Sequence, residues 1–308
     1  MCQMQVLDAT YQPSYGAVMK KIAYLASKVT LPGSPLRRSD AFEHDYMMDA
    51  LRPPFTVLGM EIQDVDWADD ELDWASFDAA LIGTTWDYWD QPEHFLATLE
   101  KIENQTHLFN SSATVRWNSD KRYLKELAAK GARTIPTLWI DKVGANEFAA
   151  AFGELGSDDL VFKRQIGAGA DGQFRLSPSD KLPAMPHPMM VQPFLSKIQE
   201  EGEYSFIFID GTFSHALLKQ AKSGDYRIQS SYGGWETKVS PTAEDLAQAQ
   251  AILQLMDETS FYARVDMIRG EDEKLLLMEL ELIEPYLYPK EGPELGSIMA
   301  DALKGRLG

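Results

Sequence analysis

Cysteine and long apolar segments are scarce in this chain of 308 residues, and each shortage excludes a class of protein. The single cysteine, Cys2, rules out an internal disulfide and fits a reducing cytoplasm. No apolar run approaches the roughly 20 residues that cross a bilayer, and the N-terminus lacks the charged-then-apolar order of a signal peptide. We therefore expect a cytoplasmic protein with no membrane partner.

Positive charge is also in short supply. The chain has 29 lysines and arginines against 47 aspartates and glutamates, which gives a net charge of −18 and a pI near 4.7. Proteins that bind nucleic acids need a basic stripe for the phosphate backbone, and this sequence has none. We expect no nucleic-acid partner, so any anionic ligand must be held by a local group of cations.

Several catalytic motifs are absent. The sequence has no G-x-x-x-x-G-K-[ST], which excludes a P-loop, and no H-R-D or D-F-G, which excludes a protein kinase. Neither G-x-S-x-G nor H-E-x-x-H occurs. The five histidines show no zinc-ligand spacing, and we interpret each as a surface or packing residue.

From residue 20 to about residue 112, strand-like and helical segments alternate. We expect strands over residues 20–26, 55–60 and 77–83, and helices over residues 40–51, with Asp40 as N-cap, and 91–101. This alternation predicts a small parallel α/β domain, in which ligands bind at the carboxyl ends of the strands. The polar and aromatic loop of residues 84–89 follows the third strand. A substrate-contacting loop and a structural loop with its tryptophans under the sheet edge fit these residues equally.

Short strands and helices continue beyond this domain. We expect strands over residues 137–140, 160–164, 189–195, 203–209 and 213–219, and helices over residues 121–130, 146–152, 241–259 and 296–307. Glu203 begins one of these strands, where a carboxylate could accept hydrogen bonds from both hydroxyls of a ribose while the backbone at residues 192–195 pairs with an adenine edge. A solvated acid is the commoner meaning of a glutamate at a strand start.

Three glycines, Gly167, Gly169 and Gly172, match the letters of a dinucleotide-binding loop, G-x-G-x-x-G. That loop requires a helix at its last glycine, whereas here a strand-like segment follows and Pro178 breaks it. The segment therefore predicts a strand, a glycine loop and a second strand. The backbone N–H groups of such a loop can bind phosphate oxygens, because glycine allows close approach, and Lys163 would add a cation. A flexible turn beside a surface lysine is the alternative.

The segment of residues 261–285 contains two β-like runs joined by the polar sequence GEDE, which predicts a hairpin. Because side chains alternate along a strand, Arg264 and Asp266 share one face, and Glu279 and Glu281 share one face. Paired across the turn, these faces would gather three carboxylates and one guanidinium. Hard oxygen ligands at this density suit Mg²⁺ or Mn²⁺. The alternative is an edge hairpin whose polar face is solvated.

The order of these motifs resembles that of the ATP-grasp superfamily, in the branch that contains bacterial glutathione synthetase, ribosomal-protein glutamate ligases and the cycloserine-forming cyclo-ligase. The resemblance covers about residues 20–305 and rests on the motifs Asn118-x-x-Lys121, Phe162-Lys163 with the glycine loop, Val191-Gln-Pro-Phe, Gly202-Glu203-Tyr, Arg227 with Gly233-Gly234, Arg264-Val-Asp266 and Glu279-Leu-Glu281. Each motif is common by itself, but this order is hard to obtain by chance. The segments TTWDYWD and WNSDKRYL are most similar to the cycloserine-type subgroup.

The resemblance implies a role for each matched position. ATP would contact Lys121, Lys163, Gly167, Gly169, Gly172, Gln192, Phe194, Leu195 and Glu203. Two Mg²⁺ ions, with Mn²⁺ as the alternative, would bind Asp266, Glu279 and Glu281. Catalysis would use Arg264, Arg227 and Lys219. The substrate would contact Thr85, Trp86, Asp87, Tyr88, Arg227, Gly233 and Gly234.

The chain departs from the family pattern at some of these positions. Glu281 stands where the family usually has asparagine, and Glu284 lies nearby, so either carboxylate could complete the metal site. Lys219 stands where arginine is frequent, and lysine offers a point charge in place of a bidentate fork. Relatives of the cycloserine type often carry arginine where this chain has Gly83.

Together these inferences predict an α/β (α+β) ATP-grasp fold with an N-terminal parallel α/β domain. We expect a disordered or dispensable arm over residues 1–18, a substrate domain over 19–114, a small ATP-grasp domain with the glycine loop over 115–190 and a C-terminal domain with the metal site over 191–308. The expected activity is ATP-dependent joining of a carboxylate to an amine, through an acyl phosphate, on a small amino acid or peptide-like substrate. A cyclo-ligase for a ureido amino acid and a non-catalytic ATP-binding protein are the alternatives, and relatives suggest a homodimer or larger oligomer.

Overall fold

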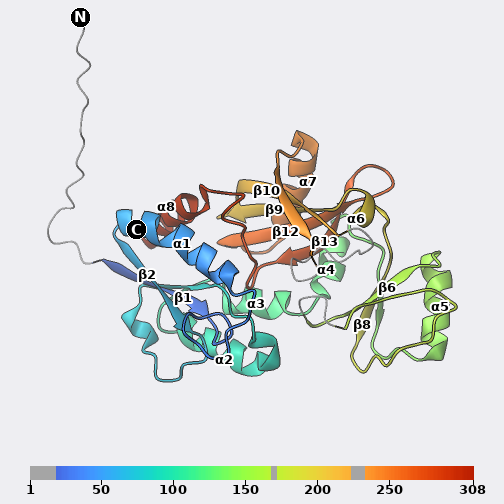
Figure 1. The fold of residues 1–308 in the computed structure, drawn as a ribbon, viewed down its shortest axis with the longest axis horizontal. Coiled ribbons are helices and arrows are strands. Elements are labelled where there is room, and N and C mark those ends of the chain that lie inside the picture. Colours follow the sequence, from blue (N-terminus) through green and yellow to red (C-terminus); the bar gives the residue numbers. More distant parts are fainter. Residues whose placement is uncertain (1–18, 168–171, 223–232) are drawn as a thin grey trace, which may run out of the picture.

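The structure is a computed structural model that describes residues 19–167, 172–222 and 233–308, and its strands form three sheets (Figure 1). The predicted arm of residues 1–18, Gly169 and Arg227 lie outside the described residues. One sheet, in blue and teal, is parallel, whereas the small green and yellow sheet and the large orange sheet are antiparallel. This mixture confirms the predicted α/β (α+β) fold class.

The parallel sheet uses the N-terminal part of the chain. Its elements are β1 (Lys20–Ala26), α1 (Phe42–Val57), β2 (Met60–Asp66), β3 (Ala79–Ile82), α2 (Pro92–Glu103), β4 (His107–Phe109) and α3 (Ser112–Asn118), with short 3₁₀ turns at Trp74–Ser76 and Tyr88–Asp90. The strand order is β2-β1-β3-β4, and the central strands are almost wholly apolar and buried, as in sheets that helices cover on both faces. This confirms the α/β domain predicted from the alternation of segments.

The prediction of a second strand over residues 55–60 is wrong. Its first residues finish α1, which runs to Val57 despite two prolines near its end, and β2 begins only after Gly59. Phe55 lies one turn after Leu51 on the buried face of the helix, and burial of that apolar stripe outweighs the proline penalty. Gly59, with φ of 79°, then turns the chain into the sheet.

Asp40 does not cap α1 as predicted. The N-cap position is Ala41, which makes no side-chain capping hydrogen bond. Asp40 instead accepts hydrogen bonds from Arg38 Nε at 2.9 Å and from Arg38 Nη2 at 2.6 Å. This bidentate ion pair holds the Arg38 guanidinium beside the start of the helix.

The small sheet is formed by the middle of the chain. Its elements are α4 (Tyr123–Ala129), β5 (Leu138–Ile140), α5 (Ala145–Leu155), β6 (Leu160–Arg164), β7 (Phe174–Leu176) and β8 (Met189–Pro193). The strand order is β5-β8-β6-β7, and α5 packs on one face of the sheet (Figure 1). Strand β6 pairs directly with β7, which confirms that the glycine loop joins two strands.

The large sheet uses the C-terminal part of the chain. Its elements are α6 (Lys197–Glu200), β9 (Glu203–Ile209), β10 (Thr212–Gln220), β11 (Trp235–Val239), α7 (Ala243–Gln254), β12 (Tyr262–Arg269), β13 (Leu275–Glu281) and α8 (Leu295–Leu307). The order is β11-β10-β9-β12-β13. The predicted hairpin is confirmed, because Arg264 lies opposite Glu281 and Asp266 lies opposite Glu279. Strand β11 was not predicted, since it is an edge strand with mostly exposed side chains.

Two buried asparagines fasten the parallel sheet and α3 to the large sheet. Asn110 Nδ2 donates to the carbonyl oxygens of Tyr262, at 3.0 Å, and Leu282, at 2.8 Å. Asn118 Nδ2 donates to the carbonyl oxygen of Leu280 at 2.8 Å, and its Oδ1 accepts from the N–H of Leu282 at 3.0 Å. These bonds satisfy backbone groups at the end of β13 and thereby fix the neighbouring site.

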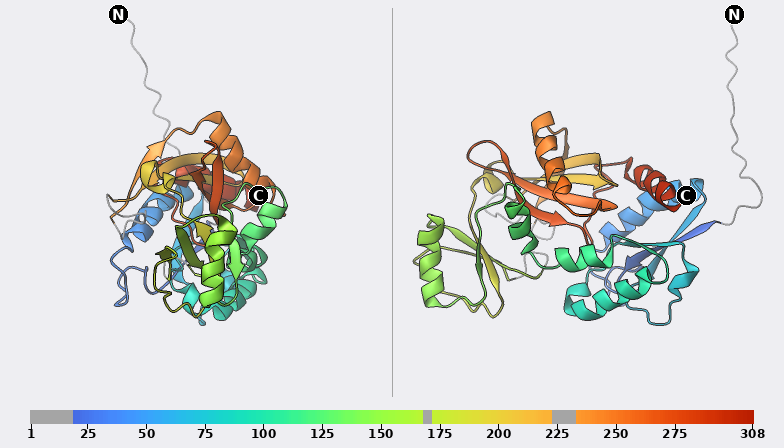
Figure 2. Two further views of the ribbon diagram at one scale, coloured as in Figure 1. Left: turned by 90° about the vertical axis from the view of Figure 1, so that its right-hand side faces the viewer. Right: turned by 180° about the vertical axis from the view of Figure 1, so that it is seen from behind.

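The last helix, α8, packs beside α1 in all views (Figures 1 and 2). Gly296 lies directly against the carbonyl of Ala50, where a larger residue would collide with the α1 backbone. Lys20 Nζ also donates to the carbonyl oxygen of Leu307 at 2.9 Å. Helix α1 is therefore packed against α8, and its buried residues share one core with residues of the large sheet. Across the described ranges, the helices include none with the length and apolarity needed to cross a membrane.

Candidate active site

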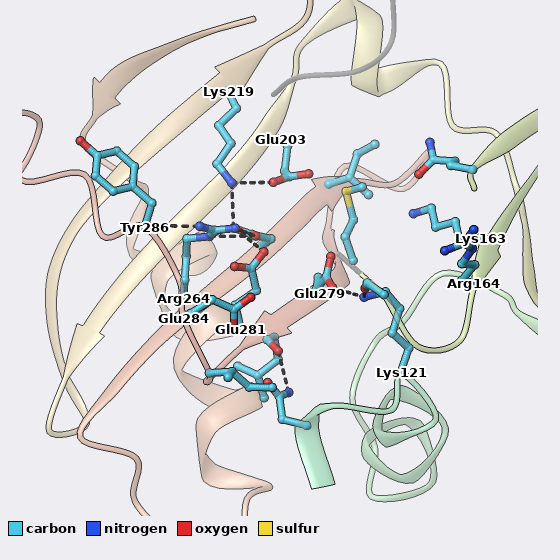
Figure 3. A pocket seen from close by; sticks show the side chains of 18 of the residues that line it. Lys121, Lys163, Arg164, Glu203, Lys219, Arg264, Glu279, Glu281, Glu284 and Tyr286 are labelled. Atoms are coloured by element: carbon cyan, nitrogen blue, oxygen red, sulfur yellow. Dashed lines mark hydrogen bonds and ion pairs between the residues drawn. The ribbon is translucent and has the colours of Figure 1, made fainter. Parts of the chain in front are cut away.

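A cavity of about 420 Å³ is lined by residues of the small and large sheets and by residues of α1 and of the loops that follow the parallel strands β1 and β3. Figure 3 shows part of this cavity. We call the part between the small and large sheets the apolar end, lined by Ile135, Val161, Phe194, Leu195, Ile198, Ile268 and Met278. We call the part between the parallel and large sheets the aromatic end, lined by Arg38, Glu43, Trp86, Tyr88, Trp89, Tyr286 and Tyr288. Charged side chains lie between these ends. Concave sites with apolar walls and a few convergent polar groups are typical of ligand binding.

The apolar end has a fixed polar edge. Gln192 is buried and its Nε2 donates to Thr137 Oγ1 at 3.0 Å. The N–H of Phe194 donates to the carbonyl oxygen of Asp159 at 2.8 Å. The residues predicted to hold adenine, Gln192, Phe194 and Leu195, all line the cavity here. Apolar walls beside an ordered backbone suit a planar aromatic base.

Two lysines point into the charged middle of the cavity from the side of the small sheet (Figure 3). Lys121 Nζ donates to Glu279 Oε1 at 2.5 Å and to the carbonyl oxygen of Gly167 at 3.0 Å. The Lys163 ammonium makes no hydrogen bond or ion pair with any residue that the structure describes. Burial lowers the pKa of Lys163 below its usual value. A partly buried cation that makes no ion pair is suited to an anionic ligand.

The glycine loop is only partly within the described chain. Gly167 lines the cavity with φ of 144°, and Gly172 has φ of 66°, so both adopt backbone conformations that favour glycine. A side chain at Gly172 would also collide with the guanidinium of Arg164. Gly172 is not part of the cavity wall, and the predicted contribution of Gly169 lies outside the described residues.

The hairpin of β12 and β13 carries the predicted carboxylates into the cavity. Asp266 accepts hydrogen bonds from Arg264 Nε, at 3.1 and 3.0 Å, from Lys219 Nζ at 3.3 Å, and from the hydroxyl of Ser205. Burial opposes ionisation, but these cations outweigh it and hold the pKa of Asp266 at about 2. Arg264 Nη2 pairs with Glu281, and its Nη1 donates to the carbonyl oxygen of Tyr286 at 3.1 Å.

The same carboxylates are chemically suited to Mg²⁺, although they do not form a finished cage. Within the described parts of the chain, no group of three or more His, Cys, Asp or Glu side chains has metal-ligand spacing. Burial nevertheless raises the pKa of Glu281 to about 8 and that of Glu284 to about 7. Lysine and arginine thus leave part of the buried negative charge uncompensated. Hard oxygen donors with excess negative charge fit a divalent cation.

Glu203 and Lys219, for which separate roles were predicted, form an ion pair with each other. Lys219 Nζ lies 3.0 Å from Glu203 Oε1, and both side chains are buried. Burial raises the pKa of Glu203 even beside this ammonium. Lys219 therefore bridges the predicted ribose ligand Glu203 and the predicted metal ligand Asp266.

The loop after β3 divides its residues between the cavity and the protein interior. Trp86 and Tyr88, two of the residues predicted to contact the substrate, line the cavity. Asp87 is turned away and accepts a hydrogen bond from Trp67 Nε1 at 2.7 Å. Thr85 is fully buried, and its hydroxyl finds no partner among the described residues. Of the other predicted substrate residues, Gly233 and Gly234 are not in the cavity wall, and Arg227 lies outside the described residues.

A buried polar network holds this loop from behind. His44 is fully buried, with Nδ1 at 2.6 Å from Thr84 Oγ1 and Nε2 at 3.2 Å from Asp64 Oδ2. The carbonyl oxygen of Thr84 accepts hydrogen bonds from Thr30 Oγ1 at 2.8 Å and from Ser27 Oγ at 3.3 Å. The loops after β1 and β3, which carry Arg38 and Trp86, are therefore fixed to each other and to α1.

The cavity residues that sequence reasoning missed include Glu43, Glu236, Tyr286 and Tyr288. Tyr288 has φ of 50°, an uncommon conformation for a bulky residue. Its ring centroid lies 5.5 Å from Lys219 Nζ and 5.8 Å from Arg264 Cζ. The two tyrosines could have been suspected, because they directly follow the acidic end of the hairpin. Glu43 carries no local sequence signal.

Comparison with known proteins agrees with this geometry. Residues 22–110 match the model of the N-terminal domain of D-cycloserine synthetase DcsG. The cycloserine biosynthesis protein DcsG of Streptomyces lavendulae is 30% identical over 285 residues, covering 85% of this chain and 94% of that protein. The crystal structure of D-cycloserine synthetase DcsG has a TM-score of 0.78 and 26% identity, over 94% of this chain and 100% of the other. The ATP-grasp ligase PsnB, complexed with a minimal precursor, Mg and ADP, shares the fold, with a TM-score of 0.64 and 15% identity over 93% of this chain and 97% of PsnB.

The fold and the charged cavity define an ATP-grasp ligase. Within that class, the chain belongs to the DcsG family. It is an enzyme that uses ATP to form C–N bonds, with Mg²⁺ as the accompanying cation. This confirms the predicted family resemblance and the predicted general activity.

Proposed function

We propose that this enzyme activates the carboxylate of a small amino acid or peptide-like molecule as an acyl phosphate and then joins it to a nitrogen nucleophile. The observation that carries this proposal is the cavity itself. Its apolar end suits the adenine of ATP, its middle presents Lys121 and Lys163, and its aromatic end offers room for a second substrate. These three environments are continuous, so a γ-phosphate and a carboxylate can meet near Arg264.

ATP occupies the side of the small sheet in this proposal. Residues 192–195 bind the adenine, Glu203 binds the ribose, and Lys121 and Lys163 bind phosphates together with the glycine loop of Gly167, Gly169 and Gly172. The unneutralised ammonium of Lys163 supports this assignment. Lys121 is now paired with Glu279 and would exchange that carboxylate for a phosphate oxygen.

Asp266, Glu279 and Glu281 would hold two Mg²⁺ ions, or Mn²⁺ in their place, with Glu284 as the nearest further carboxylate. The raised pKa values of Glu281 and Glu284 support a divalent cation at this position, because such an ion would compensate their charge. When bound, the metal neutralises the negative charge that develops on the phosphoryl oxygens.

The chemistry has two steps. A substrate carboxylate oxygen attacks the γ-phosphorus, the bond to the bridging oxygen breaks, and ADP leaves. A nitrogen nucleophile then attacks the acyl carbon and phosphate leaves. Arg264, Lys219 and Arg227 would stabilise the charge on the acyl phosphate and on the tetrahedral intermediate. No side chain needs to become covalently attached, because positioning and electrostatics lower both barriers.

A cyclising reaction is the second candidate. The match of residues 22–110 to the N-terminal domain of D-cycloserine synthetase favours it, since these residues include the loop with Trp86 and Tyr88. A ureido amino acid would then supply the carboxylate and the nitrogen within one molecule. A non-catalytic ATP-binding protein is the remaining alternative, and it would bind ATP without releasing ADP.

The proposed domain limits are 19–114, 115–190 and 191–308, and the expected assembly is a homodimer or larger oligomer in the cytoplasm. Limited proteolysis and light scattering would check the domain limits and the assembly. The function itself is tested by ADP release from purified protein with ATP and Mg²⁺, against separate pools of amino acids, dipeptides and ureido amino acids. We expect one pool to stimulate ADP release and to yield a product lighter by one water than its substrates. Binding of ATP without stimulation by any pool would contradict the proposed substrate class.

A further inference from the structure

The second step of the proposed reaction needs a proton acceptor. As the nitrogen attacks the acyl carbon, a C–N bond forms, the C–O bond to phosphate breaks, and the nitrogen must lose a proton. We propose that the carboxylate of Glu43 accepts this proton, an inference that rests on the proposed ligase function. The proton would then pass from Glu43 to solvent after phosphate has left with the bonding electron pair.

Few of the carboxylates that line the cavity are available to accept this proton. Four carboxylates that line the cavity are committed to cations: Glu203 and Asp266 to Lys219, Glu279 to Lys121, and Glu281 to Arg264. Asp40 is committed to Arg38. These side chains are occupied by their cationic partners, and Asp266, Glu279 and Glu281 are also proposed to hold the metal. They are therefore not available to accept the proton.

Three carboxylates in the cavity wall have no ion pair and no hydrogen bond to another described residue: Glu43, Glu236 and Glu284. Glu284 follows Glu281 closely and belongs to the carboxylate group proposed for the metal. Glu236 lies on the edge strand β11, beside residues that the structure does not describe. Glu43 alone among the three comes from the parallel-sheet side, which supplies most of the residues that line the aromatic end.

The position of Glu43 is fixed by its neighbours. It lies in the first turn of α1, and the next residue, His44, is fully buried and bonded to Thr84 and Asp64. Further along the helix, Ala50 packs against Gly296 of α8 without room for a side chain. A carboxylate mounted on this anchored turn can face the reacting atoms without a costly loop rearrangement.

The surroundings of Glu43 match the task of a base at neutral pH. Burial, the largest influence, raises its pKa to about 7, with a further increase from Asp40. Arg264 and Lys219, which lie across the cavity and are proposed to stabilise the acyl group, lower it. The charged and titratable groups that interact with Glu43 are Arg38, Asp40, Lys219, Glu236, Arg264, Tyr286 and Tyr288. A base is most effective when its pKa is close to the working pH.

The test compares wild type, Glu43→Gln and the control Asp49→Asn, which changes an exposed acid on the same helix. With a ureido amino acid, ATP and Mg²⁺, we expect Glu43→Gln to lower kcat by about 10²–10³-fold. The wild-type rate should fall as pH drops through about 7, and this acidic limb should disappear in Glu43→Gln. Asp49→Asn should retain the wild-type rate and limb.

Hydroxylamine separates the second step from the first. It is neutral at pH 7 and attacks acyl phosphates without a protein base, so Glu43→Gln should form hydroxamate and ADP within a few-fold of the wild-type rate. An increase in KM for the ureido amino acid with kcat unchanged would overturn the inference and make Glu43 a substrate-binding anion. Loss of hydroxamate formation in Glu43→Gln, or loss of the acidic limb in Glu236→Gln instead, would also overturn it. If wild type makes neither ADP nor hydroxamate with any pool, the proposed function fails, and the role of Glu43 fails with it.

Discussion

The two ends of the cavity hold their functional side chains in different ways. Towards the apolar end, side chains such as Lys163 and Glu279 stand on the paired strands β6 and β13. At the aromatic end, Arg38 and Trp86 stand on loops after the parallel strands β1 and β3. Strand pairing fixes the direction of a side chain through the backbone, whereas a loop side chain depends on local hydrogen bonds. We call the part of the cavity near the apolar end the strand-held side and the part near the aromatic end the loop-held side. We expect the strand-held side to determine the binding and use of ATP and the loop-held side to determine the binding of the second substrate.

The largest effect should come from the strand-held side. Lys163→Met removes a partly buried ammonium that has no partner in the described chain, so we expect ADP release to fall by about 10³-fold with no loss of thermal stability. ADP release and a melting curve measure both quantities. Lys181→Met, at an exposed position, is the control. A variant that loses stability along with activity would contradict a ligand-binding role for Lys163.

The next largest effect should distinguish two neighbouring residues of the loop after β3, Trp86 and Asp87. Trp86 faces the cavity and Asp87 is bonded to Trp67. We expect Trp86→Ala to raise the KM for the carboxylate substrate by about 10-fold or more, and Asp87→Asn to change it by less than about threefold. The KM for ATP should stay the same in both variants. Steady-state kinetics with each substrate varied would check this, and the reverse ranking would contradict the assigned directions.

A smaller effect is expected from the network behind the loop. His44→Ala would leave Thr84 and Asp64 without their buried partner, so we expect a loss of about 1–3 kcal/mol in unfolding free energy. The KM for the carboxylate substrate should rise about fivefold, because the loop is less well fixed. Urea unfolding and kinetics measure the two changes. His94→Gln, at a more exposed histidine, should alter neither, and an equal effect there would count against the network.

The smallest effect is expected in the pH dependence of folding stability. Burial raises the pKa of Glu284 to about 7, above its unfolded value, so the folded state binds the proton more tightly. Stability without Mg²⁺ should therefore fall as pH rises from about 5 to about 8, with Glu284 contributing about 1 kcal/mol between pH 6 and pH 8. Glu284→Gln should flatten this slope in melting curves. A steeper slope in the variant would contradict the cause assigned here.

Side chains on strands were predictable from the sequence. The alternation in residues 261–285 placed Arg264, Asp266, Glu279 and Glu281 in one cavity, and the structure pairs them in register. The same holds for Lys163 on β6, because a short β-like run before a glycine loop has one plausible geometry. Local backbone rules are sufficient in such segments.

Long-range packing was not predictable. The end of α1 was mistaken for a strand, because the burial of Phe55 against other elements is invisible in the local pattern. The directions of Thr85 and Asp87 depend on Trp67 and on the network of His44, which are distant in sequence. The position of Glu43 at the cavity depends on the buried network of His44 and on the packing of α1 against α8. Each of these features depends on contacts between separate elements.

The most direct test of the account follows the carboxylate oxygen. If a carboxylate attacks the γ-phosphorus, substrate labelled with ¹⁸O in its carboxylate should transfer one labelled oxygen to inorganic phosphate in each turnover. Mass spectrometry of the released phosphate measures this transfer. We predict one ¹⁸O atom per phosphate, formed together with ADP. Release of ADP and product with unlabelled phosphate would contradict an acyl-phosphate mechanism in this cavity.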